Sequence, residues 1–273
     1  MEGAEGPAPY AFEVAVASDV GTERKQNEDH CAHLVESDTV GVAIVADGVS
    51  GLAGGGAASE QAVESTLRTY RALGDMRPAR RLQRAVQQAN IDVYDRAVIV
   101  PELRGMATTL TALVVDRGEL AAAHVGDCRI YLLREGRMRQ LTKDHTVVGE
   151  KVRLGLLTEL RARYHPDRSV LTRAVGRELI VAIDRIAAPL CQGDLLILCS
   201  DGLYNVLDPL DMEEIVRGRE AASAARALVD EANGRGTPDN VTAAVVRMTG
   251  AITRPSAEGG LRARLRRLMG RGS

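Results

Sequence analysis

The chain has 273 residues, of which 45% are hydrophobic and 26% are charged, and its formal net charge is −2. This composition is typical of a soluble globular protein with one large domain or two small ones. No stretch approaches the run of about 18 uncharged apolar residues that a membrane-spanning helix needs, and the N-terminus lacks a secretion-signal pattern. The four cysteines show no C-x-x-C spacing, which favours reduced thiols over disulfides or a zinc site. We therefore expect a cytoplasmic protein, and a monomer.

The net charge hides an asymmetry between the body of the chain and its last residues. Residues 250–273 contain six arginines and one glutamate, a net charge of +5, so residues 1–249 carry −7. An acidic body argues against nucleic-acid binding, which requires a basic face. The leucines of the basic tail fall on one helical face, so the tail could contact an anionic membrane or an acidic partner. Its glycines and shortness favour a solvated, mostly disordered tail instead.

The first half of the chain predicts strands and two long helices behind a flexible tail of residues 1–11. The strands are expected at residues 12–17, 39–46, 107–115, 120–125 and 129–133, and the helices at residues 57–73 and 78–100. The tripeptides Asp116-Arg-Gly118 and Arg134-Glu-Gly136 are typical of hairpin turns, so neighbouring strands in this half are expected to be antiparallel.

The second half begins with a segment of weak periodicity, residues 144–176, which has the length of a functional lid. Further strands are expected at residues 183–186, 194–199 and 241–248, with helices at residues 209–216 and 221–232. Strands thus come in two blocks, each followed by a pair of helices. This order predicts an α+β domain with antiparallel sheets faced by helices, and not a β-α-β alternation.

Five short segments place an acidic residue at the end of an apolar run or beside glycine or asparagine. They are Arg24-Lys-Gln-Asn-Glu28-Asp29, Asp47-Gly48, Gly126-Asp127-Cys-Arg129, Ser200-Asp201-Gly202 and Asp239-Asn240-x-Thr242. A single Asp-Gly is usually a turn. Carboxylates from five segments that converge at one sheet edge would instead repel one another unless a hard divalent cation balanced them. Their number and their placement favour a Mg²⁺ or Mn²⁺ site.

Three chemistries use clustered carboxylates: glycoside hydrolysis, metal-assisted phosphoryl transfer and metal-dependent nuclease action. Glycosidases grip sugar rings with aromatic residues, which make up only 3% of this chain. The acidic body disfavours a nuclease, and the chain has no G-x-x-x-x-G-K-[ST] loop for a nucleoside triphosphate. A two-metal site for phosphoryl transfer remains, and Arg24 is either a bidentate partner for the phosphate or a solvated surface arginine.

The chain resembles the metal-dependent PPM phosphatases, also called type 2C serine/threonine protein phosphatases, from about residue 18 to residue 248. The resemblance is carried by nine motifs in the family's order: Ser18-Asp-x-Gly21, Arg24-x-x-Asn-Glu-Asp29, Val45-Ala-Asp-Gly48, Gly105-Met-Ala-Thr-Thr109, His124-Val-Gly-Asp-x-Arg129, Leu141-Thr-x-Asp-His145, Leu171-Thr-Arg-Ala-Val-Gly176, Cys199-Ser-Asp-Gly202 and Asp239-Asn-x-Thr242. Each motif alone is weak, but the ordered set is very specific. The residues within these motifs are most similar to those of bacterial stand-alone phosphatases.

The resemblance implies two packed antiparallel sheets flanked by helix pairs, a four-layer sandwich, over residues 12–249, with residues 144–176 as a flap beside the metal cleft. It implies two Mn²⁺ or Mg²⁺ ions, bridged by Asp47, with the Gly48 carbonyl on one ion and Asp201 and Asp239 on the other. By the same resemblance Glu28 and Asp29 would order bound waters.

Three further expectations follow from the family's pattern. Arg24 would hold the substrate phosphate, and Asp127 would hold a third, weaker ion together with Asp201. Many family members carry a histidine directly after Asp-Gly or in the following loop, whereas this chain has Val49 and Leu52 there. The source of the proton for the leaving group is therefore water or a metal-bound water.

The implied reaction is the hydrolysis of phosphoserine and phosphothreonine in phosphorylated proteins by in-line attack of a metal-bound hydroxide, without a phosphoenzyme. Such an enzyme would oppose a serine/threonine kinase. The alternative is a non-catalytic PPM-like domain that acts as a regulated binding module. A module of that kind should have lost metal carboxylates, and none is missing here, which favours the phosphatase.

Overall fold

The computed structural model describes residues 11–49 and 54–250, and its strands form two five-stranded antiparallel sheets. The first sheet has the order β1 (Phe12–Asp19), β10 (Val241–Met248), β9 (Leu195–Cys199), β6 (Arg129–Arg134) and β7 (Arg137–Gln140). The second sheet has the order β2 (Asp29–Ser37), β3 (Val40–Asp47), β4 (Leu110–Asp116), β5 (Glu119–Val125) and β8 (Asp184–Pro189).

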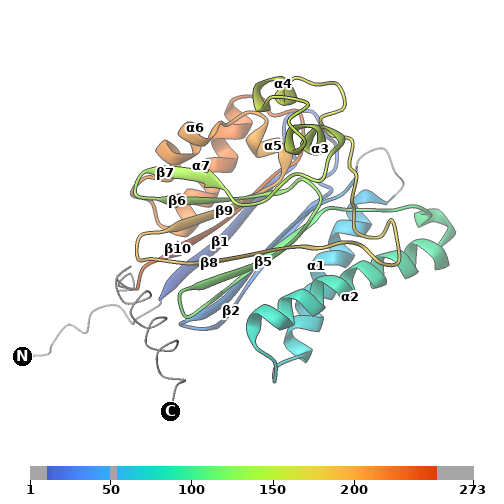
Figure 1. The fold of residues 1–273 in the computed structure, drawn as a ribbon, viewed down its shortest axis with the longest axis horizontal. Coiled ribbons are helices and arrows are strands. Elements are labelled where there is room, and N and C mark those ends of the chain that lie inside the picture. The colour runs from blue at the N-terminus through green and yellow to red at the C-terminus, as the bar shows by residue number, and fades with distance from the viewer. Residues whose placement is uncertain (1–10, 50–53, 251–273) are drawn as a thin grey trace, which may run out of the picture.

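Helices cover the outer face of each sheet, which gives four layers (Figure 1). The second sheet is covered by α1 (Gly55–Ala72) and α2 (Pro78–Ile99), and the first by α6 (Pro209–Val216) and α7 (Ala221–Gly234). Four short helices lie in the connections: η1 (Pro101–Leu103), α3 (Val147–Arg153), α4 (Glu159–Arg163) and α5 (Asp201–Tyr204). The predicted α+β sandwich with helix pairs is therefore confirmed.

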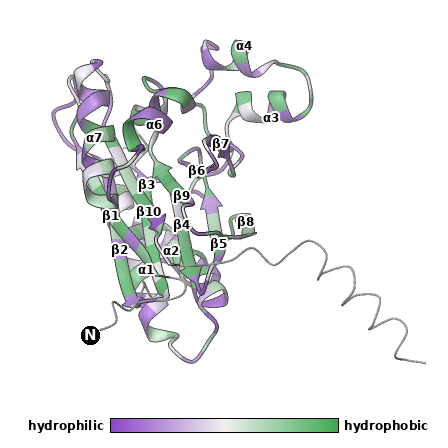
Figure 2. Ribbon diagram, turned by 90° about the vertical axis from the view of Figure 1, so that its left-hand side faces the viewer, coloured by the Kyte–Doolittle hydropathy of each residue, from purple (hydrophilic) through white to green (hydrophobic). Residues whose placement is uncertain are grey.

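The central strands are buried on both faces, which explains their nearly continuous apolar sequences. In β3, Ile44 packs toward α1 and α2, while its neighbour Val45 packs between the two sheets. In β9, Ile197 packs against α6 and α7, and Leu198 faces the other sheet. Figure 2 shows the resulting apolar layers as green strands in the middle of the molecule. Because both faces are filled, polar groups on these strands can occur only at their ends.

The two predicted hairpin turns are present, and each has two residues of positive φ. These are Arg117 (φ 47°) and Gly118 (φ 78°) between β4 and β5, and Glu135 (φ 52°) and Gly136 (φ 69°) between β6 and β7. Two consecutive residues of positive φ define the turn whose twist matches a tight antiparallel hairpin.

The structure differs from the predicted elements at β2, β7, the start of β4 and α5. Strands β2 and β7 were not predicted, because their sequences mix charged and apolar residues and lie largely exposed. The strand expected from residue 107 begins only at Leu110, since Ala107 and Thr109 instead bond with the segment that ends β3. The short helix α5 directly after Ser200 was also not predicted.

The segment predicted as a flap, residues 144–176, contains α3 and α4 and lies at the same end of the sandwich as α5 (Figure 1). No helix among residues 11–49 and 54–250 combines the length and the apolar character needed to cross a membrane. The predicted N-terminal tail and the basic tail of residues 250–273 fall almost entirely outside the described residues, as does Leu52.

Candidate metal and phosphate site

The acidic motifs meet at one end of the sandwich because each follows or precedes a strand there. Asp47 ends β3 and is paired in register with Asp29, the first residue of β2. Asp201 begins α5 directly after β9, and Asp239 lies two residues before β10. The Ser200 hydroxyl donates to Asp29 Oδ2 at 2.6 Å and so joins the end of β9 in one sheet to β2 in the other. The predicted convergence of these carboxylates is therefore present.

Burial and mutual repulsion raise the pKa values of the clustered aspartates. Burial raises the pKa of Asp29 to about 7, with smaller contributions from Asp201 and Asp239. Burial and the nearby Asp239 raise the pKa of Asp201 to about 6. The pKa values of Asp47 and Asp127 are also raised, first by burial and then by the charges of Asp29 and Asp201 respectively. The cluster thus lacks sufficient positive charge of its own.

Exposure divides the acidic residues into an inner and an outer group. Asp29 and Asp127 are buried, with 4% and 6% of their surface exposed. Glu28, Asp47, Asp201 and Asp239 each keep an intermediate exposure. The outer carboxylates can therefore reach an ion or water from the solvent side, whereas the inner two are enclosed by protein.

The inner carboxylate of Asp29 is only half satisfied within the described residues. Its Oδ2 accepts the bond from Ser200, but its buried Oδ1 finds no hydrogen-bond partner among them. A buried carboxylate oxygen without a partner is costly, so an ordered water or an ion-bound water is the natural partner. The role of Asp29 in ordering water at the site stays a prediction.

The backbone around Asp47 and Gly48 is fixed by neighbouring loops. The Asp47 N–H donates to the Thr109 hydroxyl at 2.9 Å, and its carbonyl accepts from the Thr109 N–H at 2.8 Å. A Cβ atom on Gly48 would lie 2.4 Å from the backbone of Gly55, so only glycine fits at this position. The Gly48 N–H donates to the Glu28 carbonyl at 3.1 Å, which brings these two motifs together.

Asn240 connects the first motif to the last, a role that the sequence analysis did not assign. Its Oδ1 accepts from the Glu28 N–H at 2.8 Å, and its Nδ2 donates to the carbonyls of Val20 and Gln26 at 2.8 and 2.9 Å. The buried amide thus fixes the loop that carries Arg24 and Glu28 beside the start of β10. The Asp239-Asn240-x-Thr242 motif signalled the position, but not these partners.

Arg24 lies at the outer rim of the cluster and contacts one of the predicted metal ligands. Its Nη2 donates to Asp239 Oδ2 at 2.8 Å, with 37% of the arginine side chain and 31% of the aspartate side chain exposed. An exposed ion pair of this kind contributes little stability and is readily exchanged. The guanidinium therefore stands beside the acidic cluster, where a phosphate could replace Asp239 as its partner.

The donor set fits a hydrated hard ion better than a tightly caged one. In the part of the chain that the structure describes, no three His, Cys, Asp or Glu side chains are grouped so that they could hold one ion. Magnesium keeps several of its water ligands and is often bound through only one or two carboxylates. The half-buried carboxylates of Asp47 and Asp201 suit such an ion, whereas zinc would need more nitrogen or sulfur ligands.

Comparison with known proteins agrees with the fold and identifies the family. Residues 22–233 match the family model described as Protein phosphatase 2C. The chain is 36% identical to the serine/threonine phosphatase stp of Listeria innocua over 234 residues, which cover 84% of this chain and 93% of that protein. A protein phosphatase named PhpP from Streptococcus pneumoniae is 33% identical over 246 residues, which cover 87% of this chain and 98% of that protein.

Solved structures lead to the same class. The PPM Ser-Thr phosphatase MsPP of Mycobacterium smegmatis, in complex with cacodylate, superposes with a TM-score of 0.76 at 34% identity, over 86% of this chain and 98% of that one. The fold is that of the PPM phosphatases. The chain belongs to the protein phosphatase 2C family.

The raised pKa values predict how the stability of the metal-free protein depends on pH. Since folded Asp29 holds its proton up to about pH 7, while an unfolded aspartate loses it near the ordinary value of 3.8, the folded state binds more protons between these limits. In a chelator, the free energy of unfolding should therefore fall by about 2 to 3 kcal/mol between pH 5 and pH 7.5. Urea unfolding at the two pH values measures this.

Asp47→Asn removes one charge from the cluster and should make the metal-free protein more stable than the wild type at pH 7.5. Asp38→Asn, at an exposed position, is the matched control and should change little. A wild-type stability that stays level or increases between pH 5 and pH 7.5 would contradict the crowding of the cluster.

Proposed function

We propose that this metal-dependent serine/threonine protein phosphatase uses a site for two metal ions, which Asp47 would help to hold. The Gly48 carbonyl would be a further ligand of one ion, and Asp201 and Asp239 would be further ligands of the other. When bound, such ions lower the pKa of a water molecule and neutralise the charge of a phosphate. The observation that supports this arrangement most directly is the crowding of raised-pKa aspartates at the meeting of the two sheets.

The number and kind of ions are part of the proposal. The catalytic domain of the serine/threonine protein phosphatase PstP, whose structure contains two manganese ions, superposes on this chain with a TM-score of 0.74 at 31% identity, over 87% of this chain and 98% of that one. This similarity supports two ions here, and the all-oxygen donor set supports Mn²⁺ or Mg²⁺. Glu28 and Asp29 would hold water molecules beside them, as the unpartnered Asp29 Oδ1 suggests.

Arg24 would bind the phosphate at the rim. The approach of a phosphate dianion gives its guanidinium a bidentate partner that carries more charge than the Asp239 carboxylate. The exchange would also release Asp239 toward the site. The binding of substrate to Arg24 and the binding of a metal ion by Asp239 are therefore coupled through the exposed Arg24–Asp239 ion pair.

The substrates that we propose are phosphorylated proteins of the cytoplasm, so that the enzyme reverses the action of a serine/threonine kinase. The names of the relatives support phosphoprotein substrates. All four cysteines are free thiols, two of them buried, as is usual in a reducing compartment. The alternative of a non-catalytic binding module is disfavoured because every carboxylate expected in the metal site is retained.

Release of phosphate from a phosphothreonine peptide with added Mn²⁺ tests the function, and two variants separate the roles. Asp201→Asn should abolish turnover, because it removes a charged ligand of one ion. Arg24→Ala should raise KM about tenfold and change kcat less, because the guanidinium grips the phosphate before and during reaction. Wild-type activity that a chelator leaves unchanged, or a fully active Asp201→Asn variant, would refute the two-ion proposal.

Asp127 and Asp201 would hold a third, weaker ion. Asp127 is buried, and after burial itself the charge of Asp201 contributes most to raising its pKa, so the two carboxylates repel each other. With Val49 in the position of a possible proton donor, no side chain there can protonate the leaving oxygen. A water molecule held at this acidic pair would supply that proton.

This role predicts a dependence on the leaving group. Asp127→Ala should lower kcat on a phosphothreonine peptide by about 10- to 100-fold, since an alkoxide leaving group needs the proton. Hydrolysis of p-nitrophenyl phosphate, whose leaving group departs without a proton, should fall less than about threefold. Steady-state kinetics with both substrates decides this. Equal losses on both would assign Asp127 to the two-ion site or to the fold.

A further inference from the structure

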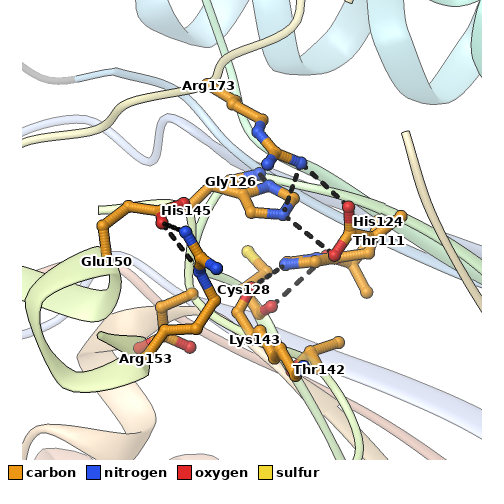
Figure 3. Close-up of polar contacts among 12 residues, drawn as sticks. Thr111, His124, Gly126, Cys128, Thr142, Lys143, His145, Glu150, Arg153 and Arg173 are labelled. Carbon is orange, nitrogen blue, oxygen red and sulfur yellow. Dashed lines mark hydrogen bonds and ion pairs between the residues drawn. The ribbon is translucent and has the colours of Figure 1, made fainter. Parts of the chain in front are cut away.

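His145 lies at the root of the flap, and both of its ring nitrogens are engaged. It is buried, with 2% of its surface exposed, between β7 and α3. Its Nδ1 accepts a hydrogen bond from the Gly126 N–H at 3.1 Å, and the backbone N–H of His145 donates to the Gly126 carbonyl at 2.8 Å. Both peptide groups of the residue directly before Asp127 are thus tied to this one histidine (Figure 3).

The turn that His145 holds is sterically demanding. Gly126 has φ +108°, and a Cβ atom there would lie 2.5 Å from the Thr109 side chain, so neither larger residues nor a large shift is tolerated. Thr109 in turn bonds the backbone of Asp47. The turn therefore sets where the Asp127 side chain begins, close to the backbone that carries Asp47.

The far side of the ring is fixed by an ion pair. Because Nδ1 accepts a hydrogen bond, the proton of the neutral ring lies on Nε2, which is 3.2 Å from Arg173 Nη1 and 3.3 Å from Asp184 Oδ2. Arg173 Nη1 donates to the other oxygen of Asp184 at 2.8 Å. A guanidinium can only donate, so Asp184 is the acceptor available to the Nε2 proton, and it favours the tautomer that leaves Nδ1 free to accept from Gly126.

His124 supports the ring from one face. The two imidazoles lie with their centroids 4.7 Å apart. His124 Nε2 donates to the Lys143 carbonyl at 3.1 Å, so its Nδ1 accepts from the Thr111 hydroxyl at 2.8 Å. The His145 ring is therefore held by its nitrogens and by its neighbour, and has little freedom to move apart from the chain that carries it.

The main chain of His145 belongs to the flap root, where two segments of the flap run side by side. Its carbonyl accepts from the Thr172 N–H at 2.8 Å, and the next residues continue the contact, with the Val147 N–H donating to the Val170 carbonyl at 2.9 Å. His145 is thus shared between the flap root and the turn that carries Asp127.

We propose that His145 is a positioning residue for Asp127, which fixes the distance between the Asp127 and Asp201 carboxylates and transmits the position of the flap root to that acidic pair. A histidine that only filled the core would need neither the side-chain bond from the Gly126 N–H nor an acceptor for its Nε2 proton. The proposal rests on the third-ion role of Asp127 given above, and the tests separate the two.

Two substitutions at His145 test separately the hydrogen bond at Nδ1 and the contact at Nε2. His145→Asn keeps an acceptor near the position of Nδ1, so the bond from Gly126 can form, but it cannot reach Asp184. His145→Gln keeps a donor near Nε2 for Asp184 and loses the acceptor for Gly126. His33→Gln, at an exposed position of β2, is the matched control.

Titration calorimetry with Mn²⁺ is the first readout. His145→Gln should lower the affinity for the most weakly bound Mn²⁺ ion by about 10- to 100-fold. His145→Asn and the control should lower this affinity much less. Affinities that fall equally in the Asn and Gln variants would overturn the proposal, since the Gly126 bond would then not matter. Amide exchange in the metal-free wild type needs no variant: a Gly126 N–H that exchanges as fast as the exposed amides of α4 would also overturn it.

A comparison of double variants makes the test independent of the third ion. On a phosphothreonine peptide, His145→Gln should lower kcat in the wild-type background and cause no further loss in a protein that already carries Asp127→Ala. Losses that multiply would show that His145 does not act through Asp127. A wild type that binds only two Mn²⁺ ions would refute the third-ion assignment, and the same comparison would still decide the role of His145.

Discussion

Electrostatic repulsion among buried carboxylates is the constraint around which this end of the protein is built. The aspartates come from both sheets, and burial raises the pKa of Asp29 to about 7 instead of leaving it ionised as on a surface. Holding such groups together requires rigid support, and the support comes from neutral donors: the Ser200 hydroxyl, the Asn240 amide and the Thr109 hydroxyl. None of them neutralises the cluster, so the charge balance is left to cations.

The same constraint explains why the flap root reaches the site. The Asp127 side chain is buried, so it cannot change its rotamer as an exposed side chain could. Its position therefore depends on the backbone of Gly126. That backbone is bonded to His145, which also joins the two segments of the flap root. A substrate protein that presses on the flap would therefore act on the acidic pair of Asp127 and Asp201 through a short chain of hydrogen bonds.

The sequence predicted the fold where local pattern and burial agree. The strand at residues 241–248 and the helix at residues 209–216 were predicted with the bounds that the structure has, because both faces of the strand are buried and the helix begins at a capped proline. Strand β2 was missed because its exposed positions interrupt the apolar pattern. In the site, ordered motifs predicted which carboxylates converge. The pairing of Arg24 with Asp239 and the bond from Gly126 to His145 were not predictable, since they depend on how segments distant in sequence pack.

Binding of Mn²⁺ to the metal-free protein at pH 6, measured by calorimetry in two buffers of different ionisation enthalpy, tests the central claim most directly. Since Asp29 and Asp201 have pKa values of about 7 and about 6, part of the cluster is protonated at this pH. At least two ions should bind with release of about one proton or more, and the release should decline toward pH 8. Binding without proton release at pH 6, or no binding at all, would contradict the account.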